Sequence, residues 1–164
     1  MQEKNSHLTM YERCLLHARA DRALRSLVGT RLEQYHLTMM EWLLLGVVCQ
    51  GPPEGLSMSA VAQSLDVTLP QVTALANKLL NLKLVRQKTQ SHDRRSRHVM
   101  PTGKGKTLLE DTEESISEAM REWLEPLPEE QVAQYFDTIA WLATHRHPDT
   151  EAKNDKPPKP IILG

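Results

Sequence analysis

The chain of 164 residues is 40% hydrophobic and 25% charged, a balance typical of a globular protein with one core or two small lobes. No apolar run approaches the ~18 residues of a membrane-spanning helix, and the polar start MQEKNSHLTM lacks the apolar stretch of a signal peptide. The net charge is −1, yet residues 86–106 hold seven of the twenty Lys and Arg residues and a single acid. We therefore expect a cytoplasmic protein that binds a polyanion through this basic segment.

The first half of the chain predicts four helices. Thr38 and Glu41 have the spacing of a capping box, and Ser57 and Thr68 are residue types preferred as N-caps. The connection over residues 66–68 is so short that the last two helices must form a tight helix-turn-helix. Apolar periodicity places the helices over residues 8–31, from Thr38 to the Gly- and Pro-rich break at 51–55, over 58–65 and over 69–82.

The second half predicts a hairpin followed by two helices. The polar segment 90–96 separates two short runs with strand character, so a hairpin is the favoured connection. The expected elements are strands over residues 84–89 and 97–100, a helix from the N-cap Thr102 toward Trp123, a last helix over 128–144 and, from 147, a Pro-rich tail without stable structure.

The helix over residues 69–82 has its apolar residues on one side and side chains that can form hydrogen bonds on the other. A helix-turn-helix followed by a hairpin is a winged helix: the helix fits the major groove of duplex DNA, and a basic wing can follow the phosphates or enter the minor groove. Asp93, paired with a neighbouring Arg, would stiffen the wing tip. The residues predicted to contact DNA are Thr68, Gln71, Thr73, Asn77, Lys78, Arg86, Lys88, Arg94, Arg95 and Arg97.

Several short motifs follow one another in a fixed order along this part of the chain. They are LSMSAVA at 56–62, then Thr68, Val72, Thr73, Leu75 and Leu79 in one helix, Leu84-Val85, Asp93-Arg94-Arg95, and Thr102 with Gly105. Together they resemble the DNA-binding lobe of the MarR family of bacterial transcription regulators, and the flanking helices extend the resemblance over residues 8–144. The resemblance implies a mainly α fold with a small β-hairpin wing, a winged helix-turn-helix flanked by N- and C-terminal dimerisation helices.

The resemblance also implies a function. We expect a homodimeric transcriptional regulator that binds a pseudo-palindromic operator; repression is usual in this family, and activation is the alternative. Release by a small phenolic or lipophilic effector is a further possibility that the resemblance implies. Tyr11, His36 and Trp42 are the residues expected to line an effector cleft, with core packing as the alternative for Trp42. The expected division is dimerisation and linking helices in 1–50, the DNA-binding lobe in 51–105, C-terminal dimerisation helices in 106–146 and a disordered tail in 147–164.

Four residues depart from the family pattern. Asp66 and Lys83 replace common glycines, although Asp tolerates a left-handed backbone better than most residues. Pro101 stands where Leu is usual before Thr102, and Ala74 replaces an Arg that often contacts bases or phosphates. Ala74 and the net acidity leave an alternative open, a winged-helix protein-interaction module without specific DNA binding.

Sensing and catalysis have less support in the sequence. Cys14 and Cys49 lie in apolar helical patterns, so we expect buried structural thiols, with redox sensing as the alternative. The seven histidines form no set with metal-ligand spacing, and a metal-sensing variant remains an alternative only. No phosphate loop or nucleophile motif is present in the sequence. We therefore predict no cofactor, no bound metal and no enzymatic activity.

Overall fold

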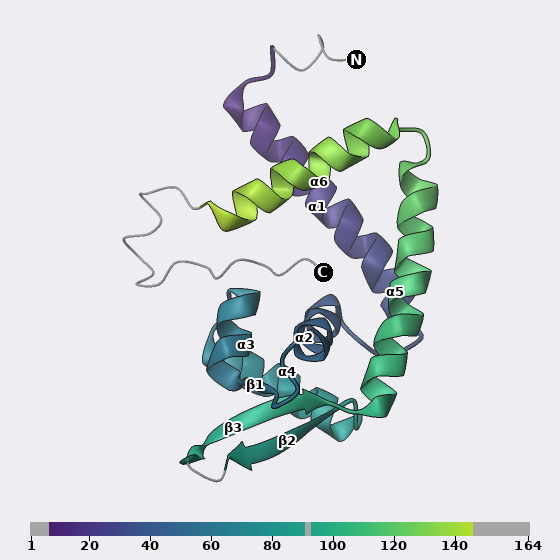
Figure 1. Ribbon diagram of the computed structural model, residues 1–164. Coiled ribbons are helices and arrows are strands. Elements are labelled where there is room, and N and C mark those ends of the chain that lie inside the picture. The colour runs from purple at the N-terminus through teal and green to yellow at the C-terminus, as the bar shows by residue number, and fades with distance from the viewer. Residues whose placement is uncertain (1–6, 91–92, 146–164) are drawn as a thin grey trace.

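The computed structural model describes residues 7–90 and 93–145, which form two lobes joined by one long helix (Figure 1). The first lobe combines the short helices α2, α3 and α4 with a small sheet, and the second contains the longer N- and C-terminal helices. The elements are α1 (Met10–Glu33), α2 (Met39–Cys49), β1 (Leu56–Ser57), α3 (Met58–Leu65), α4 (Leu69–Asn81), β2 (Val85–Gln90), β3 (Asp93–Pro101), α5 (Gly103–Leu124) and α6 (Glu129–Thr144). The predicted mainly α fold with a β-hairpin wing is confirmed.

Side-chain caps begin the helices at the positions that the sequence indicates. The Glu41 amide donates to Thr38 Oγ1 at 3.4 Å, while the Glu41 carboxylate accepts from the Thr38 amide at 2.8 Å. Ser57 Oγ accepts from the Ala60 amide at 3.1 Å and begins α3. Each cap satisfies an amide that the first helical turn leaves without a partner. These local contacts set where α2 and α3 begin.

Two departures from the family pattern end helices in a left-handed conformation. Asp66 has φ 53° and Lys83 has φ 60°, and both occupy the position after the last helical turn. At the end of α4 the Lys83 amide donates to the Leu80 carbonyl and the Leu84 amide donates to the Leu79 carbonyl. This paired closure is the Schellman motif, in which glycine is usual because it has no Cβ.

The sheet is larger than the predicted hairpin. Its order is β1-β3-β2, with both pairings antiparallel. The short strand β1 was not predicted, because two residues are too few to show alternation. The prediction that residues 90–96 form a polar loop was wrong at both ends, because β2 continues to Gln90 and β3 begins at Asp93. The two residues pair across an irregularity between Thr89 and Gln90.

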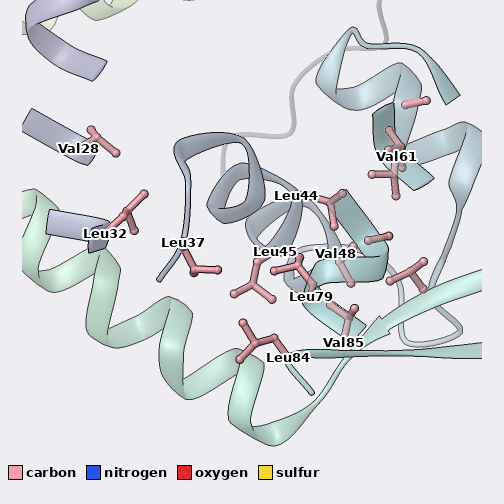
Figure 2. Packing of buried hydrophobic residues seen from close by; sticks show 14 of the residues in the cluster. Val28, Leu32, Leu37, Leu44, Leu45, Val48, Val61, Leu79, Leu84 and Val85 are labelled. Atoms are coloured by element: carbon pink, nitrogen blue, oxygen red, sulfur yellow. The ribbon is translucent and has the colours of Figure 1, made fainter. Parts of the chain in front are cut away.

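The hydrophobic core lies around α2 in the lobe that contains the sheet, and it reaches α1 and α5 (Figure 2). Leu44, Leu45 and Leu79 have no exposed surface. By contrast, α6 has no buried residue. The chain therefore completes the core of one lobe and leaves apolar surface on the helices of the other. The most deeply buried side chains include Leu32, Leu44, Leu45, Val48, Val61, Val72, Leu79, Leu84 and Val99.

Candidate nucleic-acid interface

One face of α4 is open to solvent, opposite the face that packs in the core. Val72 and Leu79 are fully buried, whereas Gln71, Thr73 and Asn77 are exposed. Apolar anchors spaced one or two turns apart hold the helix, and the intervening polar residues are thereby placed on the outer face. The predicted separation of apolar and polar sides of α4 is confirmed.

Several polar groups on this face are already bonded within α4. The amide and the hydroxyl of Thr68 both donate to Gln71 Oε1, at 2.9 and 2.8 Å. The Thr73 hydroxyl donates to the Leu69 carbonyl at 2.9 Å. Asn77 makes no side-chain hydrogen bond with residues 7–90 or 93–145. The Asn77 amide and the Gln71 Nε2 are therefore the groups best able to meet a base edge.

Lys78, the one cation of α4, is bound to α2. Its Nζ donates to Glu41 Oε2 at 2.8 Å, and the same oxygen accepts from the Thr38 amide. Glu41 is only 5% exposed. Burial alone would raise the pKa of this carboxyl group, but the hydrogen bonds from Lys78 and Thr38 outweigh it and lower the pKa below its usual value. The carboxylate is therefore ionised, and the ion pair formed, at neutral pH.

The wing presents cations on both faces of a hairpin that extends away from the helices (Figure 1). Arg86 and Lys88 are two residues apart on β2, so they share a face, and both are exposed. Arg97 is exposed on β3 opposite Thr89 and therefore lies on the other face. The backbone of Asp93, Arg94 and Arg95 is part of β3, but their side chains lie outside the described part of the structure, as does any pairing of Asp93.

A cavity of about 650 Å³ opens between the two lobes, bordered by α1, α2, α5 and α6. Trp42 lines it and donates from its indole Nε1 to Thr112 Oγ1 at 3.0 Å. Tyr11 and His36 do not line this cavity. Tyr11 is 74% exposed on the first turn of α1, and His36 is exposed in the turn after α1. The structure thus does not bring together the three residues predicted to form an effector cleft.

The candidate sensing residues also differ from expectation. Cys14 is exposed on α1, so the prediction that it is buried was wrong for the single chain. Cys49 is half-buried, and burial raises the pKa of its thiol, which keeps the thiol protonated at neutral pH. Within residues 7–90 and 93–145 no group of three or more His, Cys, Asp or Glu could hold a metal ion. No helix in those ranges is long and apolar enough to cross a membrane.

A helix-turn-helix with an exposed polar helix beside a basic hairpin defines a winged-helix protein. Residues 36–96 match the model of the MarR family. The fold resembles a MarR-family transcriptional regulator from Rhodococcus sp. RHA1, with a TM-score of 0.75 at 22% identity over 84% of this chain and 96% of the other. The local sequence match and the shared fold show that the chain resembles the MarR-family winged-helix regulators. The matched structures are described as transcriptional regulators, which agrees with the prediction that the chain is not an enzyme.

Two further structures of this fold carry bound molecules. CouR from Rhodococcus jostii RHA1, bound to p-coumaroyl-CoA, has a TM-score of 0.74 at 22% identity over 87% of this chain and 99% of its own. The MepR–DNA complex of S. aureus has a TM-score of 0.70 at 22% identity over 81% of this chain and 95% of its own. At 22% identity, each of these two comparisons shows that the fold is shared.

Proposed function

We propose that the chain is a homodimeric repressor that binds a pseudo-palindromic operator in double-stranded DNA. The observation that carries this proposal is the exposed polar face of α4 beside exposed Arg86, Lys88 and Arg97. The helix supplies groups for base edges and the wing supplies cations for phosphates. The DNA complex of MepR, which has the same fold, supports the assignment.

Dimerisation is proposed from the apolar surface of the helical lobe. Phe136 and Trp141 on α6 are 47% and 58% exposed, and Trp123 near the end of α5 is 44% exposed. Monomeric proteins rarely leave so many large apolar side chains in water on neighbouring elements. A second copy would cover them and place a second recognition helix for the other operator half-site.

An effector is proposed for the cavity beside Trp42. Its lining is mostly apolar, including Leu24, Met39 and Met120, which suits a small lipophilic or phenolic molecule. CouR, with the same fold, was solved with p-coumaroyl-CoA. Release of the protein from operator DNA by such a compound would support this part of the proposal.

The deciding experiment is DNA binding by the full chain, measured by fluorescence anisotropy. A random duplex and a duplex selected from a random pool are titrated between about 50 and 200 mM salt. We expect binding to both, a steep loss of affinity with salt and tighter binding to the selected duplex. Binding that is absent at low salt would refute the proposed function.

The alternative is a winged-helix protein-interaction module that does not bind specific DNA. Two observations favour it: Ala74 is exposed where a cation is frequent in the family, and Lys78 is engaged with Glu41. No preference for any duplex in the same titration, together with weak salt dependence, is the result expected from such a module.

A further inference from the structure

We propose that Lys78 is a positioning residue, which holds the recognition helix α4 against α2 through Glu41 and does not itself contact DNA. This inference rests on the DNA-binding function proposed above, and it changes the role expected for Lys78. Its basis is the ion pair of 2.8 Å between a cation of α4 and a carboxylate of α2.

The carboxylate is committed to this pair by its surroundings. Glu41 is 5% exposed, and its Oε2 accepts from both Lys78 Nζ and the Thr38 amide. Moving Lys78 away to a DNA phosphate would leave a buried negative charge without its cation, a loss that phosphate binding would have to exceed. A DNA phosphate, in contrast, is solvated by water and counterions without Lys78. We therefore expect Lys78 to stay paired with Glu41 when DNA is bound.

The position of the pair lets it control the direction of the base-facing side chains. Lys78 follows Asn77 directly and lies between the buried residues Ala76 and Leu79. It is thus at the edge between the packed face and the open face of α4. An ion pair at this edge restricts rotation of α4 about its axis, and such a rotation would re-aim Asn77 and Gln71 together.

The test compares Lys78→Met and Glu41→Gln in the anisotropy titration. Both variants break the ion pair, but only the first removes a cation. Gln keeps an oxygen that can accept from the Thr38 amide, so the cap of α2 is retained. Arg25→Met is the matched control, because it removes a cation from the exposed Asp21–Arg25 pair on α1.

If Lys78 positions α4, both variants lower the ratio of selected to random DNA affinity by about tenfold, the effect of misplacing one base contact. The slope of log affinity against log salt stays that of the unmodified protein. The affinity ratio of the double variant falls no further than that of the more affected single variant. Lys78→Arg restores the ratio, because Arg can also pair with Glu41. Arg25→Met changes neither quantity.

Contact of Lys78 with a phosphate gives a different pattern. Lys78→Met then lowers the salt slope by about one, while Glu41→Gln frees Lys78 and tightens binding; that pattern overturns the proposal. If the unmodified protein binds neither duplex, the proposed function fails instead. Urea unfolding of the unmodified protein, Lys78→Met, Glu41→Gln and their double variant then decides whether the pair holds α4. If the two single variants lower the free energy of unfolding by amounts that add up in the double variant, that role is overturned as well.

Discussion

Lys83 ends the recognition helix in a conformation that suits glycine better than lysine. Its φ of 60° brings the Cβ close to the backbone, a cost of about 1–2 kcal/mol for a residue with a side chain. The Schellman closure of α4, through Lys83 and Leu84, requires this conformation. The residue is exposed, so its side chain adds no packing to offset the cost.

We therefore expect Lys83→Gly to stabilise the protein by about 0.5–1 kcal/mol, since relief of strain exceeds the added entropy of the unfolded chain. Urea denaturation measures the change. Lys83→Ala is the control, because it removes the charged side chain but keeps the Cβ. An equal gain from both variants would show that charge, and not backbone strain, is responsible.

Gly105 is required by a close approach of two backbone segments. A Cβ at this position would overlap the carbonyl oxygen of Leu84, whereas one at Gly103 would meet nothing within 4 Å. We expect Gly105→Ala to destabilise the protein by roughly 1–3 kcal/mol, as overpacking does, and Gly103→Ala to have little effect. Thermal unfolding of the two variants tests this. Equal melting temperatures would contradict the close packing of Leu84 against α5.

Among the elements, the proposed function assigns different parts of DNA binding to the wing and to α4. The wing carries exposed cations on both of its faces, and the charge of Lys78 on α4 is neutralised by Glu41. Affinity should therefore depend mainly on the wing and sequence choice mainly on α4.

Arg97→Ala tests the contribution of the wing. Affinity should fall on selected and random duplexes alike, and the salt slope should fall by about one, because one phosphate contact is lost. Anisotropy at several salt concentrations measures both quantities, with Arg25→Ala on α1 as the control. An unchanged slope would rule out a phosphate contact by Arg97.

Asn77→Ala tests the contribution of α4. We expect the affinity for the selected duplex to fall by about 1–3 kcal/mol, because a bidentate amide contact with a base is lost. Binding of the same variant to random duplex is the internal control and should stay nearly constant. Equal losses on both kinds of DNA would refute base recognition by Asn77.

At the scale of the whole molecule, α6 has no buried residue in the single chain and exposes Phe136 and Trp141. We expect Phe136→Glu with Trp141→Glu to halve the mass seen in sedimentation and to weaken operator binding, because charges would be buried at the subunit contact. Asp137→Ala, at an exposed polar position of the same helix, is the control. A monomeric unmodified protein would contradict the proposed dimer.

Much of the fold could be predicted because its signals are local. The caps at Thr38, Ser57 and Thr102 involve residues three positions apart, and all three begin helices in the structure. The strand β1 escaped prediction because its two residues gain their structure only by pairing with β3. Tyr11 and His36 do not line the cavity beside Trp42, and periodicity could not show this because it does not say how helices from distant segments cross.

The winged helix, the basic wing and the polar outer face of α4 could all be predicted from the sequence, since each depends on short-range periodicity, capping and local charge. Contacts between residues far apart in the chain are visible only in the folded protein. Lys78 and Glu41 are 37 positions apart, and their pairing follows from the packing of α2 on α4. Long-range packing in the same way decided that Gly105 has no room for a side chain and that the outer surface of α6 is left uncovered.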